Sequence, residues 1–341
     1  MKPEVSERLF IEDLFRKSKE RLKDTSYQLN NIERLTGDAS TRRYYRLFTE
    51  KKSFVACLDN PSQTGLNPFI SVLDFLKDYR LRIPHIYDMD LSKGYILEED
   101  LGDTTLLKHL STIGSKEEEF LIYKEILDQL LVLHKIPQDE IKKSGIFQEM
   151  FDYTKLKSEI DFTTDFFLKR YLGITDEDSL ARVSEVFDPL CKRLASENMV
   201  LTHRDFHSRN IMVKDKDFVM IDFQDARLGI PQYDLVSMLE DCYYRVGMYN
   251  KNMLIKYYYE NLPVEIHQQK DFESFMKLYN DMALQRVFKA IGSFSYIYET
   301  RKDIRYLKYI GFAMEKIKSI LFDDNTYDEL RKTLFKYYYE S

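Results

Sequence analysis

A short segment near the middle of the chain, Leu201–Ala226, constrains the fold more than any other stretch. Its sequence is L-T-H-R-D-F-H-S-R-N-I-M-V-K-D-K-D-F-V-M-I-D-F-Q-D-A. Two apolar runs, 211–213 and 218–221, are separated by the charged turn 214–217. Short apolar runs on either side of a tight polar turn predict a β-hairpin. The hairpin would fold Asp222, which follows the second run, back beside the residue that precedes the first.

Three oxygen-bearing side chains would then face one polar space. Asn210 immediately precedes the first apolar run, and Asp205 lies five residues before Asn210. Phosphoryl transfer needs a base that orients a hydroxyl group, and oxygen ligands for the Mg²⁺ that bridges the phosphates. Because Mg²⁺ takes few protein ligands and keeps waters and phosphate oxygens, Asn210 and Asp222 are suitable in kind and number. The segment therefore predicts a phosphoryl-transfer site with Asp205 as its base.

The order of residues in this segment matches the protein-kinase catalytic loop, H-R-D-L-x-x-x-N. His203, Arg204, Asp205 and Asn210 occupy the specified positions, and only the leucine after the aspartate is replaced, by phenylalanine. The Mg²⁺-binding D-F-G motif appears at 222–224 as D-F-Q. We interpret His203, Arg204 and Asp205 as catalytic residues. The alternative is an ordinary polar loop followed by a surface hairpin.

The composition is that of a globular protein. Of 341 residues, 44% are hydrophobic, which is enough for a full core. There are 51 basic and 57 acidic residues, a net charge of −6, and this balance does not favour a nucleic-acid partner. Three scattered cysteines, Cys57, Cys191 and Cys242, predict a reducing cytosol without a disulfide framework. Because we find neither a signal-peptide core nor an apolar run that could span a bilayer, we expect a cytoplasmic protein with no membrane partner.

The N-terminal part alternates strand-like runs with polar turns. Residues 32–35, 44–48 and 54–58 are strand-like, and residues 5–24 predict a surface helix. In kinases, a loop after the first strand lies over the ATP phosphates, where small residues let backbone N–H groups approach an anion and arginine adds charge-assisted bonds. Taken alone, such a turn is more often only a turn. The expected nucleotide contacts of this region are Gly37, Asp38, Ala39, Ser40, Thr41, Arg42, Arg43 and Arg46.

A strand that runs directly into an acidic segment marks a predicted hinge between two lobes. The strand 95–97 is followed by an acidic stretch that contains glycine. Backbone groups of such a hinge can pair with adenine, which makes Glu98, Glu99 and Leu101 candidate nucleotide contacts. A plain acidic loop is the equal alternative.

From residue 105 onward the pattern becomes helical. The segments 120–134, 151–172, 178–197 and 233–239 carry apolar residues at helical spacing, and 250–341 is mostly helical. A sheet followed by helices predicts an α+β fold of the bilobal, protein kinase-like type. Its small antiparallel-sheet N-lobe is expected at 1–100, and its larger, mainly helical C-lobe, with the catalytic loop and the acceptor site, at 101–341.

One length limits the size of the phosphate acceptor. Only ten residues separate Asp222 from the helix that begins at Tyr233. A protein kinase needs an activation loop and an A-P-E segment in that interval. Since neither fits, we expect a small molecule as the acceptor.

The chain resembles the aminoglycoside phosphotransferase and choline kinase superfamily. Within that group it is most similar to the bacterial N-acetylmuramate/N-acetylglucosamine anomeric kinases of cell-wall recycling. The resemblance covers about residues 32–312 and rests on separated blocks at 37–46, 67–69, 97–103, 203–210, 222–226, 233–237 and 285–292.

The resemblance implies an activity and a role for several residues. Such enzymes transfer the γ-phosphate of ATP to the anomeric hydroxyl of an amino sugar. Asp205 would be the base, while Asn210 and Asp222 would hold Mg²⁺. Residues 37–42 would cover the phosphates, and 98–101 would form the adenine hinge. ATP and Mg²⁺ are therefore the expected cofactors.

Five residues are expected at the sugar. Two of them closely follow the metal-binding aspartate in the sequence. Two others lie three residues apart on a predicted helix and share one face, where their charges could meet a lactyl carboxylate. For the latter pair, ordinary solvated charges are the simpler alternative. The five residues are His207, Gln224, Asp225, Arg286 and Lys289.

One departure from the wider kinase pattern concerns phosphate binding. The lysine of V-A-I-K is absent, because residues 55–58 are V-A-C-L. Either Arg43 or Arg46 supplies the missing charge, or the grip on the phosphates is weak. Two alternatives to a sugar kinase stay open: an aminoglycoside or choline-type kinase of the same fold, and a catalytically inactive nucleotide-binding regulator. We expect a monomer.

Overall fold

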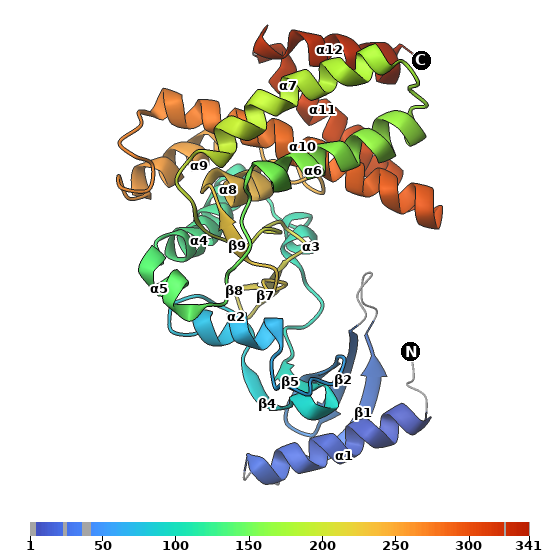
Figure 1. Ribbon diagram of the computed structural model, residues 1–341. Helices are drawn as coiled ribbons and strands as arrows, with labels where there is room; N and C mark the ends of the chain where they lie inside the picture. The colour runs from blue at the N-terminus through green and yellow to red at the C-terminus, as the bar shows by residue number, and fades with distance from the viewer. Residues whose placement is uncertain (1–4, 23–25, 36–41, 324, 341) are drawn as a thin grey trace. The chain divides into compact units, whose positions relative to one another are not determined.

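The computed structural model describes residues 5–22, 26–35, 42–323 and 325–340 (Figure 1). Contacts divide the chain into two compact units. Unit 1 comprises Met1–Asp78, Arg82–Thr104 and Met212–Gln224, and unit 2 comprises Tyr79–Leu81, Thr105–Ile211 and Asp225–Ser341. This division differs from the single boundary predicted after residue 100, because the segment Met212–Gln224, which ends with D-F-Q, groups with the N-terminal part of the chain.

Unit 1 is built on a five-stranded antiparallel sheet. The strand order is β1-β2-β3-β5-β4, so the strands predicted in the N-terminal part of the chain all belong to one sheet. The strands are β1 (Leu29–Arg34), β2 (Arg43–Thr49), β3 (Ser53–Leu58), β4 (Ile86–Asp90) and β5 (Tyr95–Glu99).

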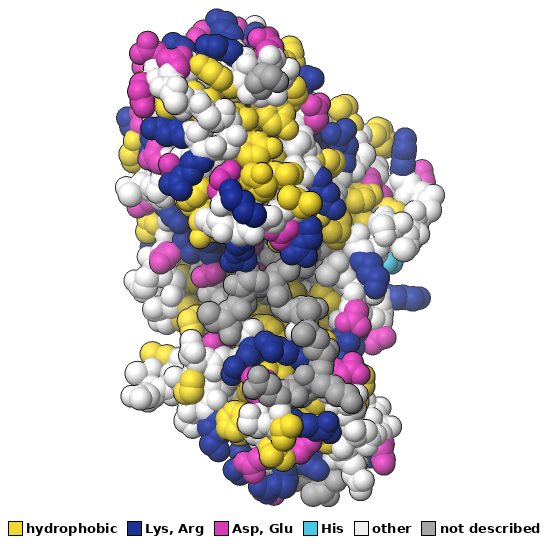
Figure 2. Space-filling view, turned by 90° about the vertical axis from the view of Figure 1, so that its right-hand side faces the viewer, with side chains coloured by type: hydrophobic (Ala, Val, Ile, Leu, Met, Phe, Trp, Pro, Cys, Tyr) yellow, Lys and Arg dark blue, Asp and Glu magenta, His cyan; other side chains and the backbone are white. Residues whose placement is uncertain are grey.

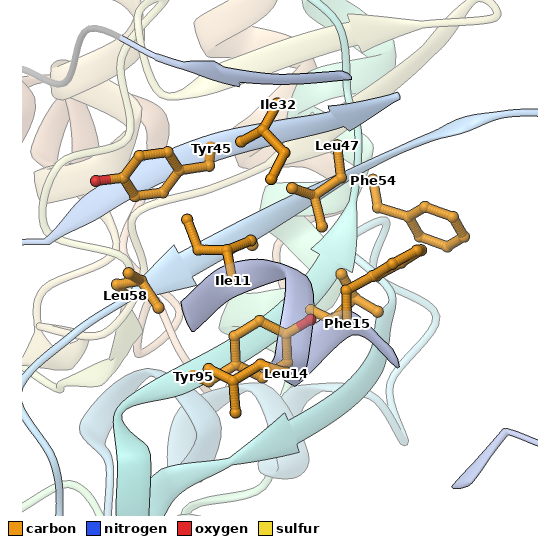
Figure 3. Packing of buried hydrophobic residues seen from close by; sticks show 11 residues of the cluster. Ile11, Leu14, Phe15, Ile32, Tyr45, Leu47, Phe54, Leu58 and Tyr95 are labelled. Carbon is orange, nitrogen blue, oxygen red and sulfur yellow. The ribbon is translucent and has the colours of Figure 1, made fainter. Parts of the chain in front are cut away.

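Helix α1 (Val5–Arg21) covers one face of this sheet. Its buried residues recur at helical spacing, whereas those of β2 alternate, so that the apolar faces of the helix and the strand meet in one core. Figure 3 shows the side chains of α1 packed against those of the strands. The cluster contains Ile11, Leu14, Phe15, Ile32, Tyr45, Leu47, Phe54, Ala56, Leu58, Tyr95 and Leu97. The predicted surface helix is therefore half core, with Leu9 on its exposed side.

Helix α2 (Pro68–Leu76) and a hairpin complete unit 1. The side chain of Asn67 caps α2 by accepting from two backbone N–H groups, and Pro68 occupies the first turn, where no donor is needed. The predicted hairpin is confirmed as β7 (Ile211–Lys214) and β8 (Asp217–Met220). Backbone bonds from Val213 to Thr104 and from Met220 to Arg82 hold it within unit 1.

Unit 2 is helical, apart from a two-stranded sheet of β6 (Val200–Thr202) and β9 (Arg227–Gly229). Its helices are α3 (Leu106–Leu110), α4 (Lys116–His134), α5 (Gln138–Ser144), α6 (Tyr153–Thr163), α7 (Glu177–Ala195), α8 (Gln232–Leu239), α9 (Met248–Asn261), α10 (Phe272–Arg301), α11 (Leu307–Asp323) and α12 (Asp328–Leu334). Segments of 3₁₀ or π helix in unit 2 are Thr164–Tyr171, Ile304–Tyr306, Asn325–Tyr327 and Phe335–Tyr339, and Leu91–Lys93 forms a 3₁₀ turn in unit 1.

Two helices form the centre of unit 2. Helix α10 packs against α6, α7, α8 and α11, and all eight residues of α8 are buried. At Gly292 the backbone of α10 approaches α6 so closely that a Cβ would lie 2.3 Å from the hydroxyl oxygen of Thr163.

The segment predicted as one helix over 151–172 is helical, but its second half is not an α-helix. It is an α-helix only to Thr163 and continues as a π-helix. At the junction, the Thr163 hydroxyl bonds the carbonyls of Glu159, at 3.0 Å, and Phe288, at 3.3 Å. A side chain that bonds a carbonyl of its own helix competes with the regular backbone pattern, which the sequence periodicity does not reveal.

The surface carries charges of both signs. On the face drawn in Figure 2, Lys and Arg side chains lie interspersed with Asp and Glu in each unit, and hydrophobic side chains form a band on the helical unit. In the part of the chain that the structure describes, no helix combines the length and the apolar character that crossing a bilayer requires.

Candidate active site

The predicted catalytic loop leaves β6 in unit 2 and is anchored by a buried carboxylate of α8. Asp234 accepts the backbone N–H of His203, at 2.6 Å, and that of Arg204, at 3.0 Å. Arg204 has a φ of +81°, a conformation that residues with side chains rarely adopt. Such strain persists only where the surroundings enforce it, and the two bonds to Asp234 provide that enforcement.

A second carboxylate holds the other half of the loop. Asp241, just after α8, accepts from the backbone N–H groups of Ser208, at 3.0 Å, and Tyr243, at 2.8 Å. Within the loop, the amide nitrogen of Asn210 donates to the carbonyl of Asp205 at 3.0 Å. Sequence reasoning missed both anchoring aspartates as functional residues. An Asp inside the apolar run of α8 was the available signal, because a buried charge requires partners.

Three cations surround the carboxylate of Asp205. Its Oδ1 lies 3.4 Å from a guanidinium nitrogen of Arg286 and 4.0 Å from Nζ of Lys289, and its Oδ2 lies 3.7 Å from Nε of Arg204. Burial alone would raise the pKa of Asp205, but Lys289, Arg286 and Arg204 lower it well below its usual value. The side chain is 28% exposed. Asp205 is therefore an ionised, partly accessible carboxylate.

Arg286 and Lys289 share the face of α10 that the sequence predicted. Arg286 is almost fully buried, donates from Nε to Ser237 Oγ at 3.1 Å, and lies over the ring of Tyr233, 5.5 Å from its centroid. Lys289 makes a weaker contact with Asp205. Its pKa is lowered by burial and by the neighbouring Arg286, while Asp205 opposes this shift. The two cations thus differ: Arg286 is fixed in place, and Lys289 is less constrained.

A pocket of about 140 Å³ opens beside these residues, entirely within unit 2. Its walls combine charged and apolar side chains from the catalytic loop, α8, the segment after it and α10. They are Asp205, His207, Val236, Ser237, Glu240, Asp241, Cys242, Tyr243, Arg286, Val287, Lys289, Ala290, Ser293 and Phe294. Such a mixture suits a small polar molecule with some apolar surface.

The other predicted acceptor residues have different surroundings. His207 lines the pocket, and burial lowers its pKa. Asp225 lies outside this pocket and forms an ion pair with Arg204 at 2.8 Å. Gln224 belongs to unit 1, where it donates to Asp222 at 2.7 Å.

In unit 1, the start of the predicted phosphate loop, Gly37 to Thr41, lies outside the described residues. Arg42 follows it and donates from Nε to Asp59 Oδ2 at 3.0 Å, while its guanidinium lies 5.7 Å from the centre of the Phe69 ring. Asp59 also accepts from the side-chain amide of Asn67, at 3.3 Å. Arg42 is therefore positioned by a carboxylate and by an aromatic ring.

The two arginines proposed to replace the absent lysine are both paired with carboxylates. Arg43 lies 3.1 Å from Glu7 and is half exposed. Arg46 contacts Asp100 at 2.8 Å and Asp103 at 2.9 Å. Each of these cations is thus engaged by acidic groups of its own unit.

The predicted hinge contains two glutamates in different surroundings. Burial raises the pKa of Glu98 to about 8, against the opposing effect of Arg42. Glu99 bonds Arg82 at 2.6 Å and Lys214 at 3.0 Å, and these bonds outweigh its burial and lower its pKa to about 2. Any contact with adenine here would therefore come from backbone groups, including those of Leu101.

The aspartate of the D-F-Q sequence ends the hairpin. Asp222 has a φ of +66°, and the ring of Phe223 after it stacks on Phe69, with centroids 5.2 Å apart. Within the described ranges, no group of three or more His, Cys, Asp or Glu side chains is arranged to hold a metal. A carboxylate from Asp222 and an amide oxygen from Asn210 nevertheless fit Mg²⁺ chemically, since this ion takes few oxygen ligands from protein.

Comparison with known proteins places the chain in a family. The model of the phosphotransferase enzyme family matches residues 31–260. The chain belongs to this family. The resemblance inferred from the sequence blocks is therefore confirmed.

Curated relatives of the chain are named as sugar kinases. The N-acetylmuramate/N-acetylglucosamine kinase of Pseudomonas aeruginosa is 29% identical over 274 residues, covering 80% of this chain and 78% of that protein. The protein of the same name from Neisseria meningitidis is 27% identical over 267 residues, covering 76% of this chain and 77% of its own length. Together with the family match, these kinases identify the chain as a phosphotransferase with an alcohol group as acceptor.

Solved structures share the fold. The ADP-bound aminoglycoside phosphotransferase APH(2'')-Ib superposes with a TM-score of 0.59 at 16% identity, covering 90% of this chain and 98% of its own. The choline kinase LicA from Streptococcus pneumoniae also gives 0.59 at 16% identity, covering 91% and 99%. The expected α+β, protein kinase-like fold is confirmed.

Proposed function

We propose that this phosphotransferase transfers the γ-phosphate of ATP to the anomeric hydroxyl of an amino sugar, N-acetylmuramate, N-acetylglucosamine or both. The observation that carries the proposal is the ionised carboxylate of Asp205 at a small pocket that also presents two cations of α10. The names of the relatives supply the substrate class.

Asp205 accepts and orients the sugar hydroxyl. Because its pKa is low, the carboxylate is ionised at neutral pH and ready to accept a hydrogen bond. A weak base of this kind suits phosphoryl transfer, in which positioning and charge stabilisation contribute most of the rate. Asp234 keeps the loop in its strained shape, so Asp205 needs no rearrangement before the reaction.

Asn210 and Asp222 are the proposed Mg²⁺ ligands. When bound, Mg²⁺ bridges phosphate oxygens and neutralises the charge that develops during transfer. On the nucleotide side, Arg42, whose guanidinium is oriented by Asp59 and Phe69, joins Arg43 and Arg46 as a proposed source of the charge that the absent lysine would supply. The backbone of 98–101 is proposed to hold adenine.

Lys289 is the proposed contact for the lactyl carboxylate of N-acetylmuramate. Arg286 is committed to Ser237 and lies over a tyrosine ring, whereas Lys289 approaches Asp205 only to 4.0 Å. An ammonium that lines the pocket with so long a contact can turn to a second carboxylate. A choline-type acceptor is disfavoured, because an aromatic cage would need the ring of Tyr243, over which Arg209 already lies at 5.0 Å.

The deciding experiment measures ATP consumption with N-acetylglucosamine, N-acetylmuramate, kanamycin and choline, and identifies the products by ³¹P NMR. Anomeric phosphate on either sugar, absent in Asp205→Asn, supports the proposal. General-base loss typically costs about 10²–10⁴-fold in rate. Transfer to kanamycin or choline with neither sugar phosphorylated would overturn the substrate class. An Asp205→Asn variant that keeps half of the wild-type activity would exclude this residue from the mechanism.

A second experiment separates the two sugars. Lys289→Met should weaken the reaction of N-acetylmuramate selectively, by about 1.5–3 kcal/mol if a charged hydrogen bond is lost. Lys277→Met, on an exposed part of the same helix, is the matched control. Equal losses for both sugars would contradict the lactyl contact but leave a sugar kinase in place.

We further propose that the protein is a cytoplasmic monomer. Its three cysteines are buried thiols that form no disulfide, which suits a reducing compartment. Light scattering after gel filtration tests the oligomeric state, and a dimer at micromolar concentration would contradict it.

A further inference from the structure

A second and larger pocket lies in unit 2, among α8, α9, α10 and α11. Its volume is about 420 Å³, against about 140 Å³ for the pocket at Asp205. Glu240, at the end of α8, lines both pockets. The apolar part of the wall includes Leu239, Val246, Ile255, Met276 and Ile320.

Two lysines pair with the single negative charge of Glu240. Lys251 Nζ lies 2.8 Å and Lys316 Nζ 3.2 Å from its oxygens, and the Tyr279 hydroxyl donates at 3.1 Å. One cation would balance this buried carboxylate, so the second lysine leaves an excess positive charge. The two lysines outweigh burial and lower the pKa of Glu240, which keeps it ionised.

The remaining charges of the wall do not cancel this excess. Arg245 is exposed and lies over the ring of Phe312, 5.2 Å from its centroid. Glu315, the other acid of the wall, accepts from Tyr339 at 3.1 Å and lies 3.9 Å from Lys318. The pocket thus offers three cations beside an apolar surface, and only Glu240 among its acids is directed at them.

We propose that this second pocket binds a small anionic molecule, with a phosphate or carboxylate group at Lys251 and Lys316 and a partly apolar body. Lysine ammonium groups bind either anion as point charges. Ligand pockets are typically apolar with a few placed polar groups, as this one is.

Binding there would act on the neighbouring pocket through Glu240. An anion that draws a lysine away from Glu240 leaves the negative charge of this carboxylate less balanced beside Asp241, which accepts the backbone N–H of Tyr243 in the wall of the acceptor pocket. The expected result, which rests on the proposed function, is a raised KM for the acceptor with little change in kcat. When the anion is added, a KM for the acceptor that rises in wild type but not in Lys251→Gln would indicate regulation through this pocket.

Direct binding tests the site without any enzymatic assay. We would titrate the full-length protein calorimetrically with phenyl phosphate, benzoate and neutral benzamide. At least one of the two anions should bind, and Lys251→Gln should weaken it roughly ten- to hundredfold, the equivalent of one charged hydrogen bond. Lys256→Gln, on the same helix but exposed and paired with Glu260, should bind as wild type does.

The other outcomes would overturn the proposal. These are equal binding by wild type and Lys251→Gln, binding of benzamide as tight as that of the anions, or loss of binding on Lys289→Gln instead, which would place the anion in the acceptor pocket. If Lys251→Gln fails to fold, Lys316→Gln replaces it, because Lys316 is the second proposed contact of the anion and Lys251 still balances Glu240; it should weaken the anion by the same ten- to hundredfold. Loss of kinase activity towards sugars would leave this binding result unaffected.

Discussion

Replacing Asp234 by asparagine should separate the positioning of the catalytic loop from the chemistry of Asp205. Asp234 is fully buried and touches no part of the acceptor pocket. Both of its oxygens accept backbone N–H groups of the loop, and Oδ2 also lies 3.2 Å from His134. An asparagine has the same shape, but only one of its two terminal atoms can accept.

The expected loss can be worked out from these contacts. In Asp234→Asn, the amide NH₂ must face either the N–H of His203 or that of Arg204, so one charged hydrogen bond is lost. Such a bond contributes about 1.5–3 kcal/mol. Because Arg204 is held at a φ of +81° by these bonds, the loop should also relax. A displacement of the base by about 1 Å typically costs about 10²-fold in rate.

The assay compares two buried aspartates of unit 2. Asp281→Asn is the matched control, because Asp281 is equally buried, bonds Arg193 at 2.6 Å and Tyr327, and belongs to α10 away from the loop. Both variants should melt at lower temperature than wild type. Only Asp234→Asn should lose kcat, by roughly 10²-fold, when measured well below the melting temperature. Full kcat in a folded Asp234→Asn protein would refute the assignment of this residue as the loop's anchor.

Three further predictions concern other parts of the molecule. Glu98 has a pKa of about 8 in the folded protein, against an ordinary value of 4.5, so the folded state holds its proton more tightly than the unfolded state does. The free energy of unfolding should therefore fall as the pH rises between these values, by about 1.4 kcal/mol per pH unit at most. Glu98→Gln should remove this slope in melting curves from pH 5 to 9, and an unchanged slope would exclude the residue as its origin. Gly292→Ala should destabilise the protein by about 1–3 kcal/mol, because the new Cβ would meet a hydroxyl of α6 at 2.3 Å. Gly311→Ala, whose Cβ would have its nearest atom at 3.6 Å, should not destabilise it. Equal chemical denaturation midpoints for the two variants would contradict this prediction. Asn210→Ala and Asp222→Ala should each raise the Mg²⁺ concentration needed for activity, and unchanged Mg²⁺ titrations in both would argue against the metal site.

Local periodicity predicted those features of the chain that depend on neighbours in sequence. Arg286 and Lys289 are three residues apart, and a helix brings such residues to one face whatever surrounds it. The hairpin that ends at Asp222 is likewise encoded by two apolar runs and one turn. The roles expected for these three residues nevertheless stay predictions.

Contacts between distant segments could not be predicted in this way. The bonds from Asp234 to the catalytic loop span about thirty residues, and the ion pair between Lys214 and Glu99 spans 115. No spacing rule relates such partners, because the tertiary fold brings them together. The same reason explains Arg43, expected at the phosphates but paired with an acid of α1.

The complete burial of α8 has a consequence for redesigning this enzyme. Every residue from Gln232 to Leu239 is enclosed, and the helix supplies Asp234 to the loop and Ser237 to Arg286. Substitutions there would disturb catalysis and folding together. Directed evolution of a new acceptor preference should therefore accumulate changes on the pocket face of α10 and in the segment 242–243, and leave α8 intact.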